Sequence, residues 1–492
     1  MISFLISIAA LVLGYFIYGA FVDRVFGPDP SRKTPAVSKA DGVDFIAFPN
    51  WKVFMIQFLN IAGTGPIFGA IMGAKFGPSS YLWIVFGCIF AGAVHDYMCG
   101  MLSVRHGGSG FPELVGEYLG KRTKKVMLAF SILLLLLVGT VFVYSPAVIL
   151  GGEDLAGDGS RGAIMIWVGV IFVYYVVATL LPIDKLIGRI YPLFASALLF
   201  MAVALMVCLF IKWPSLPEIW QDLGGCHSTA RLGDQPIFPC LFITIACGAI
   251  SGFHATQSPL MARCIRSEKM GRPVFYGSMI TEGLVALIWA AVASWFFFDG
   301  GAAEVGPDVS AEAPAVVTKV SEGWLGLLGG ILAILGVVAA PITSGDTAFR
   351  SARLIIADFL HLEQKGIGHR LLVALPLFAA SALLLWYNIA DEDGFNVIWN
   401  YFGWSNQTLA AFMLWTATVY LFRRGKGYYL ITLLPALFMT AVCVTFILVD
   451  KTGFRVPQTL APWIGLGTFA VSALLWLLWK SRKAAAQVTN NQ

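Results

Sequence analysis

The chain has 492 residues, of which 58% are hydrophobic and only 12% are charged. A soluble globular protein carries about 25% charged residues, so this composition excludes one and is typical of an integral membrane protein. The net charge of +5 is spread over loops. We expect basic runs such as 121–125 to meet anionic lipid head groups and not nucleic acid.

Apolar runs long enough to cross a bilayer, which takes about 20 residues, recur along the chain. They predict an all-α protein with thirteen transmembrane helices, at residues 2–22, 51–74, 80–102, 126–149, 163–182, 189–211, 238–262, 273–298, 324–349, 371–388, 396–421, 428–449 and 463–479.

The basic residues predict the orientation of these helices. Most of the 33 Lys and Arg residues fall in alternate loops, as they do in cytoplasmic loops. We therefore expect an outer N-terminus and a cytoplasmic C-terminus in the cell (inner) membrane. The first helix lacks a signal cleavage pattern, so we expect it to be retained. Cys226 and Cys240 both fall on the outer side, where they would form a disulfide if that compartment is oxidising.

Two of the predicted helices are interrupted. The segment 51–74 contains the run Ala62-Gly-Thr-Gly-Pro66, and 238–262 combines Gly248 and Gly252 with polar residues and Pro259. Irregular backbone at membrane depth is tolerated only inside protein or beside a cavity. Two such segments in corresponding halves of a chain indicate the central site of a transporter.

Several residues around these breaks are candidates for cation binding. Glycine and proline free backbone carbonyls at Ala62 and Gly63, and the hydroxyls of Thr343 and Ser344 follow Pro341. Hard cations prefer such oxygen ligands. The alternative is a proline kink with close packing of small residues.

Two carboxyl groups at membrane depth, Glu282 and Asp346, are candidate proton carriers, with His254 as a partner for Glu282. The alternatives are a neutral hydrogen-bonding role for Glu282 and a helix-end salt bridge between Asp346 and Arg350. The pair at 95–96 is expected at the membrane interface, with a proton relay as the alternative.

Other segments carry weaker signals. The proline-containing loop 23–50 is expected to be a solvated connector, and Phe111 to Gly120 a short surface helix with proline near its start and glycine past its end. Cys247 is expected to be a packing residue. Asn400, Asn406 and Gln407 are expected to bind substrate or neighbouring helices.

The helices divide into two sets of five, 51–211 and 238–421, each beginning with an interrupted helix. An odd number per set predicts an inverted repeat, which is common in secondary transporters. Residues 1–50 form a first helix and linker, and 422–492 form two peripheral helices and a short tail.

The strings ACGAISGFHATQSPLMAR, PITSGDTAFRSARLIIADFL and NIAGTGPIFGAIMGAKFG resemble the carbon starvation protein A family. The resemblance implies a 5+5 inverted-repeat fold of the leucine-transporter-like superfamily and import of pyruvate or peptides across the inner membrane when carbon is scarce. It implies that Ala62, Gly63, Thr343 and Ser344 hold a sodium ion, and that Gly252, His254, Thr256 and Gln257 face the substrate. The chain is shorter than the longest members.

We therefore expect a secondary transporter coupled to a proton or sodium gradient, with no cofactor other than a bound cation. The substrate is expected to contact Asn60, Gly63, Thr64, Gly65, Gly252, His254, Thr256, Gln257 and Asn406. No ATP-binding GxxxxGK[ST] motif occurs and no catalytic constellation of an enzyme is recognisable. The alternative is a nutrient-sensing receptor without net transport, although the chain shows no soluble signalling domain.

Overall fold

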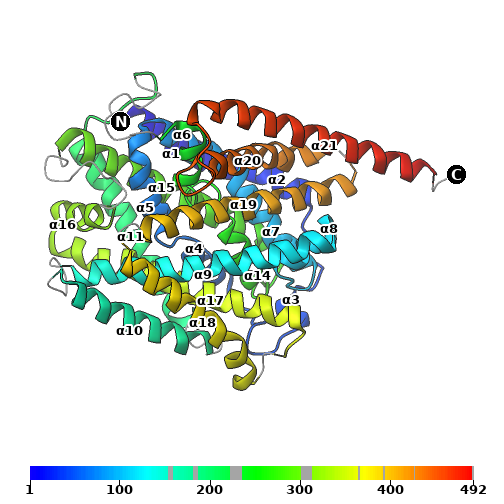
Figure 1. Ribbon diagram of the computed structural model, residues 1–492, viewed down its shortest axis with the longest axis horizontal. Coiled ribbons are helices and arrows are strands. Elements are labelled where there is room, and N and C mark those ends of the chain that lie inside the picture. The colour runs from blue at the N-terminus through cyan, green and yellow to red at the C-terminus, as the bar shows by residue number, and fades with distance from the viewer. Residues whose placement is uncertain are drawn as a thin grey trace.

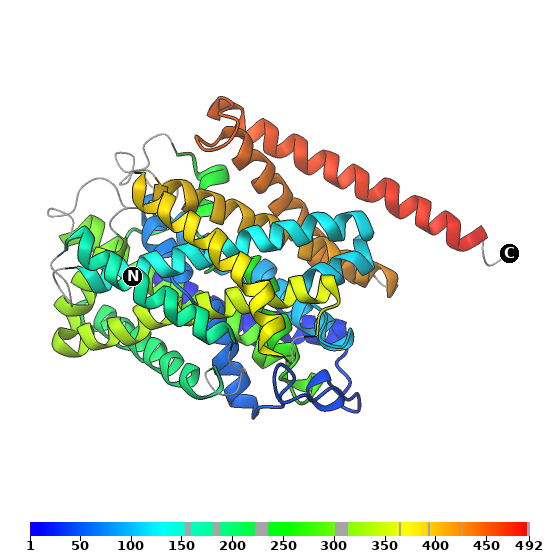
Figure 2. The same cartoon turned by 60° about the horizontal axis from the view of Figure 1, so that its bottom comes forward.

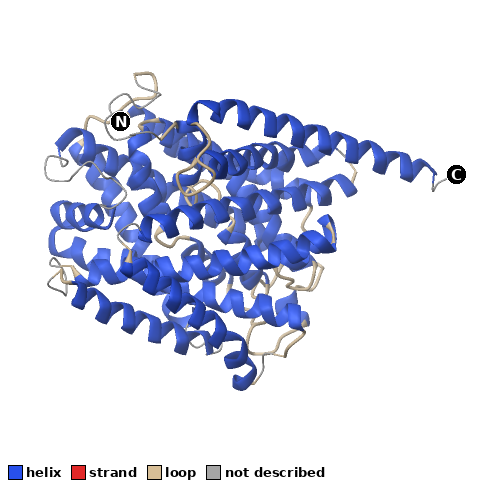
Figure 3. Ribbon diagram, in the orientation of Figure 1, coloured by secondary structure: helices blue, strands red, loops and turns tan. Residues whose placement is uncertain are grey.

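The computed structural model describes residues 1–152, 159–180, 187–221, 235–300, 313–363, 366–391, 394–425 and 427–489. All regular elements in these ranges are helices, as Figure 3 shows. This confirms the predicted all-α class. Helices are expected here because lipid offers no hydrogen-bond partners to the backbone, and a membrane-spanning helix forms all its backbone hydrogen bonds internally.

The first part of the chain forms α1 (Ile2–Phe16), α2 (Tyr18–Phe26), α3 (Pro35–Ser38), α4 (Asn50–Ile61), α5 (Gly65–Gly73), α6 (Ser79–Gly87), α7 (Ala93–Arg105), α8 (Phe111–Leu119), α9 (Lys121–Gly151), α10 (Arg161–Leu180) and α11 (Ile187–Lys212). The second part forms α13 (Ile237–Thr244), α14 (Phe253–Ala262), α15 (Gly277–Trp295), α16 (Ala313–Leu332), α17 (Ala339–Leu360), α18 (Ile367–Ala390), α19 (Gly394–Arg423), α20 (Leu430–Val449) and α21 (Ala461–Thr489).

Within the described ranges, 10 helical stretches are long and apolar enough to cross a membrane, or 11 if α4 and α5, bent by 47°, count as one. The interrupted pair α13 and α14 and the long helix α19 are not among them. Polar residues at the centre of α19, such as Asn406 and Gln407, lower its hydropathy. The total of thirteen and the 5+5 repeat therefore stay predictions.

The helices differ strongly in how much of their surface is inside the protein. The stretches containing α15 and α17 are 83% and 81% buried, whereas those of α10 and α21 are 28% and 17% buried. In Figures 1 and 2, α21 runs along one edge of the bundle and projects beyond it. The centre of the protein is thus formed by α15, α17 and the broken helices, and lipid-facing helices surround it.

The helix predicted at 324–349 has the wrong limits. α16 ends at Leu332, and a π-helical segment, Ala333–Val338, leads directly into α17, which continues to Leu360. Val338 is itself helical, with φ −85° and ψ −46°, so the chain stays helical from the π-helical segment through Pro341. Asp346 and Arg350 are fully buried in the interior of this helix, so the alternative of a salt bridge at a helix end does not hold.

The linker between α2 and α4 is exposed over much of its length, as expected for a solvated connector, but it is also anchored to the rest of the protein. Thr34 is fully buried, and its hydroxyl donates to the carbonyl oxygen of Ile265 at 2.6 Å. The backbone N–H of Phe48 donates to the carbonyl oxygen of Cys264 at 3.2 Å. The linker therefore packs on the chain that immediately follows α14. The predicted short helix after Gly110 is confirmed as α8.

Candidate functional site

The first break separates α4 from α5. Ala62 leaves the helical conformation with φ −83° and ψ 62°, and Pro66 in the first turn of α5 has no N–H to donate. Asn60 and Thr64 are fully buried here, and neither the amide atoms of Asn60 nor the hydroxyl of Thr64 has a hydrogen-bond partner in the protein. An unmet buried polar group costs about 1–3 kcal/mol, so this break offers polar atoms that a ligand would satisfy.

The second break, residues 245–252 between α13 and α14, is filled by a side chain from α19. Asn406 Oδ1 accepts hydrogen bonds from Ser251 Oγ at 3.0 Å and from the backbone N–H of Phe253 at 2.6 Å. The carbonyl oxygen of Asn406 accepts from the N–H of Gly252 at 3.1 Å. A Cβ at Gly252 would lie 2.1 Å from that oxygen, so only glycine fits. Asn406, predicted to contact substrate, caps the N-terminus of α14 in this structure.

The first break contacts α17 at the predicted cation residues. Ser344 Oγ donates to the carbonyl oxygen of Leu59 at 3.1 Å, and a Cβ on Gly63 would lie 3.3 Å from Ser344 Oγ. Thr343 Oγ1 donates to the carbonyl oxygen of Ala340 at 2.8 Å. Gly63, Thr343 and Ser344 thus lie in one region with several oxygen atoms, the ligand type that hard cations prefer. Ala62 immediately precedes Gly63 at the same break.

Asp346 lies one turn further along α17 and has a partner that sequence reasoning missed. The hydroxyl of Tyr191, on α11, donates to Asp346 Oδ2 at 3.0 Å and to the carbonyl oxygen of Thr343 at 2.8 Å. Asp346 Oδ1 has no hydrogen-bond partner. A single tyrosine in an apolar helix gives little signal in the sequence, because its partner comes from a helix far along the chain.

A buried polar cluster joins α7, α14 and α15. His254 Nδ1 lies 2.9 Å from Asp96 Oδ2, and His254 Nε2 lies 3.4 Å from Glu282 Oε2. Asp96 Oδ1 lies 2.7 Å from His95 Nδ1. All four side chains are fully buried. The expected pairing of His254 with Glu282 is therefore present, and the interfacial position expected for the 95–96 pair is wrong because α7 packs against α14 in the interior.

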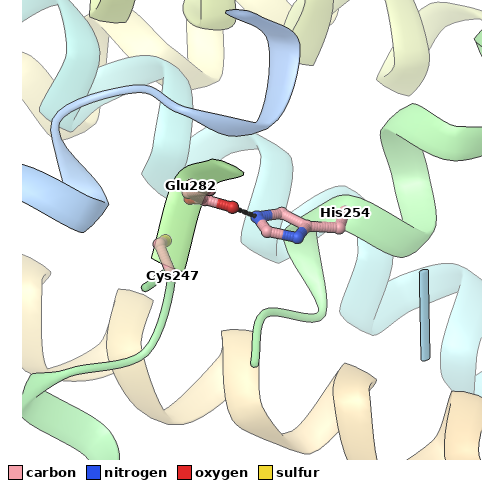
Figure 4. A group of neighbouring side chains, drawn as sticks. All are labelled: Cys247, His254 and Glu282. Carbon is pink, nitrogen blue, oxygen red and sulfur yellow. Dashed lines mark ion pairs between the residues drawn. The ribbon is translucent and has the colours of Figure 1, made fainter. Parts of the chain in front are cut away.

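Cys247, in the second break, completes this cluster. Its sulfur, a ring nitrogen of His254 and a carboxylate oxygen of Glu282 lie within 4.8 Å of one another (Figure 4). A Cβ on Gly65 would lie 2.3 Å from the Cys247 sulfur, so the cluster also adjoins the first break. From the sequence, Cys247 was expected to be a packing residue, because a small residue beside glycines is typical of close helix packing.

The remaining predicted residues of α14 face α17. Gln257 Nε2 donates to Ser351 Oγ at 3.3 Å, and Ser351 Oγ donates to the carbonyl oxygen of Thr256 at 3.1 Å. Gln407 donates to the carbonyl oxygen of Phe242 at 2.7 Å. Asn400 and Cys240 line a different, small cavity of about 50 Å³. Cys226 lies outside the described residues, so its disulfide with Cys240 stays a prediction.

Comparisons with known proteins agree with this architecture. Two solved structures share the fold: the manganese transporter of Eremococcus coleocola, with a TM-score of 0.56 and 13% identity over 90% of this chain and 99% of that one, and a Na⁺-coupled sialic acid symporter, with a TM-score of 0.54 and 15% identity over 96% of both chains.

Several sequence relatives are more similar. An uncharacterized membrane protein of Haemophilus influenzae is 45% identical over 60% of this chain and 91% of its own. The peptide transporter CstA of Campylobacter jejuni is 27% identical over 88% of this chain and 78% of its own. The pyruvate/proton symporter BtsT of Escherichia coli is 27% identical over 58% of this chain and 48% of its own.

The family model described as carbon starvation protein CstA matches residues 1–150, 148–325 and 317–446. These matches extend over both breaks and over α17. The chain belongs to the carbon starvation protein CstA family.

Proposed function

We propose that this protein is a secondary active transporter that imports pyruvate or a short peptide by alternating access, driven by a cation gradient. The observation that carries the proposal is the meeting of two broken helices in the buried centre, where Asn60 and Thr64 present polar atoms without partners in the protein. The relatives that have functional names are transporters and not enzymes.

The first break is the better place for the substrate carboxylate, which pyruvate and peptides share. The N-terminal end of a helix carries partial positive charge and backbone N–H groups that bind anions. At the second break, Asn406 already accepts from the N–H groups of Gly252 and Phe253. At the first break, α5 begins at Gly65, directly after Thr64, so we place the carboxylate at this end of α5, within reach of Asn60 and Thr64.

Two sets of residues are candidates for coupling. A sodium ion would use oxygen atoms of Ala62, Gly63, Thr343 and Ser344. A proton would use Glu282 or Asp346, both fully buried carboxyl groups. The Escherichia coli relative is named a pyruvate/proton symporter, and one structural neighbour is named a Na⁺-coupled symporter. Both ions are therefore included in the test.

The test is uptake of labelled pyruvate and of a labelled dipeptide into proteoliposomes, with proton and sodium gradients imposed separately. We expect saturable uptake of one solute that depends on one gradient, and we expect Asn60→Ala to reduce it at least tenfold. If sodium drives uptake, Ser344→Ala should raise the sodium concentration needed for half-maximal uptake. Absence of gradient-dependent uptake of either solute, in folded and inserted protein, would favour the receptor alternative.

A further inference from the structure

The cluster of Cys247, His254 and Glu282 combines three side chains that bind transition metals. They come from three places: the second break, the first turn of α14 and the interior of α15. Figure 4 shows the carboxylate of Glu282 directed at the ring of His254, with Cys247 beside them. Within the described part of the chain this is the one group of three or more such residues whose ligand atoms lie within 4.8 Å of one another.

Two of the three ligand groups have no competing hydrogen bonds, and the Cys247 sulfur has only long contacts, to Ser251 Oγ at 3.6 Å and from Asn406 Nδ2 at 3.9 Å. His254 Nε2 and both carboxylate oxygens of Glu282 are buried without a hydrogen bond, and the 3.4 Å contact between them lacks hydrogen-bond geometry. Two ligands around a tetrahedral zinc ion are separated by about 3.3–3.8 Å, given zinc–ligand bonds of about 2.0–2.3 Å. The distance of 3.4 Å between His254 Nε2 and Glu282 Oε2 lies in this range, and the Cys247 sulfur, within 4.8 Å of both ligands, needs to approach by at most about 1 Å.

Asp96 orients the histidine for this role. Its Oδ2 lies 2.9 Å from His254 Nδ1, which leaves Nε2 directed toward Cys247 and Glu282. Metal-binding histidines usually donate their other ring N–H to a carboxylate in this way, which fixes the tautomer and the ring orientation. Asp96 is in turn held by His95 Nδ1 at 2.7 Å. Asp96 is therefore a positioning residue and not a ligand.

From this geometry we propose that Cys247, His254 and Glu282 form a binding site for one divalent transition-metal ion of the zinc class, with a fourth position open. A thiolate, an imidazole and a carboxylate are ligands that zinc accepts together. The two negative charges balance the ion inside the protein, where an unpaired charge is costly. Because Cys247 lies in the second break and His254 lies just after it, a bound ion fixes this break and the start of α14 relative to α15.

The test is equilibrium dialysis of purified protein in nanodiscs against Zn²⁺, followed by absorption spectroscopy with Co²⁺. We expect one bound ion per chain and a thiolate-to-cobalt charge-transfer band. Cys247→Ser should remove the band and weaken Zn²⁺ binding at least tenfold, and Asp96→Asn should weaken it about 10–100-fold. Cys443→Ser, a buried cysteine on α20, is the matched control and should change neither.

Each variant is first shown to keep its thermal stability and elution profile, so that lost binding is not lost folding. Equal Zn²⁺ binding by the unchanged protein and by Cys247→Ser would overturn the proposal, as would a cobalt spectrum without the thiolate band. Binding is measured without a gradient or a nutrient. Its failure therefore leaves the transport proposal unaffected, and failure of uptake leaves the metal site unaffected.

Discussion

The two broken helices differ in whether the buried polar groups at the break have hydrogen-bond partners within the protein. At the second break, oxygen atoms of Asn406 accept hydrogen bonds from the hydroxyl of Ser251 and from the backbone N–H groups of Gly252 and Phe253. At the first break, Asn60 and Thr64 keep polar atoms without partners although both are fully buried. A break that is capped by protein is rigid and serves to position side chains, whereas one with unmet polar atoms is prepared for a ligand. We therefore propose that the first break binds the substrate, whereas the second positions side chains around it.

The largest loss of stability should follow from adding a side chain at Gly252. A Cβ there would lie 2.1 Å from the backbone carbonyl oxygen of Asn406, and a backbone atom cannot move aside as a flexible side chain can. We expect Gly252→Ala to separate α14 from α19 and to destabilise the protein by about 1–3 kcal/mol or more. Thermal unfolding in detergent measures this. Gly169→Ala on α10, where a Cβ meets nothing within 4 Å, is the control.

The next prediction compares the same substitution, asparagine to alanine, at the two breaks. Asn406→Ala removes the acceptor for Ser251 and Phe253 and should lower stability by about 1–3 kcal/mol. Asn60→Ala removes polar atoms that have no partner, so it should leave stability unchanged or raise it while uptake falls. Unfolding and uptake are measured on both variants. A stability loss for Asn60→Ala equal to that for Asn406→Ala would remove the distinction between the breaks.

A smaller effect is expected at the junction of the first break with α17. Tyr191→Phe removes the donor to Asp346 and to the carbonyl oxygen of Thr343, and should shift the concentration of coupling cation needed for half-maximal uptake several-fold. Tyr175→Phe is the matched control, because the hydrogen bonds of its hydroxyl go to the carbonyl oxygens of Phe142 and Pro341 and not to Asp346. Equal shifts in the two variants would show a packing effect only.

The smallest effect concerns a contact remote from both breaks. Burial alone would raise the pKa of Glu218, but hydrogen bonds from the N-terminal amino group, the hydroxyl and N–H of Ser3 and the N–H of Ile2 lower it from 4.5 to about 2. A carboxyl group with a lowered pKa stabilises the folded state above its unfolded-state pKa, here 4.5, and this contribution is lost as the pH falls toward about 2.

We therefore expect the melting temperature to fall between pH 5 and pH 3 by more in the unchanged protein than in Glu218→Gln, which has no charge to lose. Parallel melting curves for the two proteins over this range would contradict the assignment. Uptake near neutral pH should be the same in both, because α1 lies outside the broken helices.

The sequence predicted those features that depend on local chemistry. Glycine and proline within apolar segments predicted both breaks, and the cost of a carboxyl group at membrane depth pointed to Glu282 and its partner His254. Residues whose role depends on packing between distant helices could not be found in this way. Cys247, Asp96 and Tyr191 acquire their partners only when α7, α11, α14, α15 and α17 assemble. The same reason explains why the sequence does not predict the contacts that anchor the linker before α4.

That linker has a consequence for movement. The hydrogen bonds from Thr34 to Ile265 and from Phe48 to Cys264 tie it to the chain directly after α14, on the face predicted to be cytoplasmic. In the proposed alternating-access cycle, any movement of this end of α14 away from the linker would have to break both hydrogen bonds, so the linker would restrain the opening of this face.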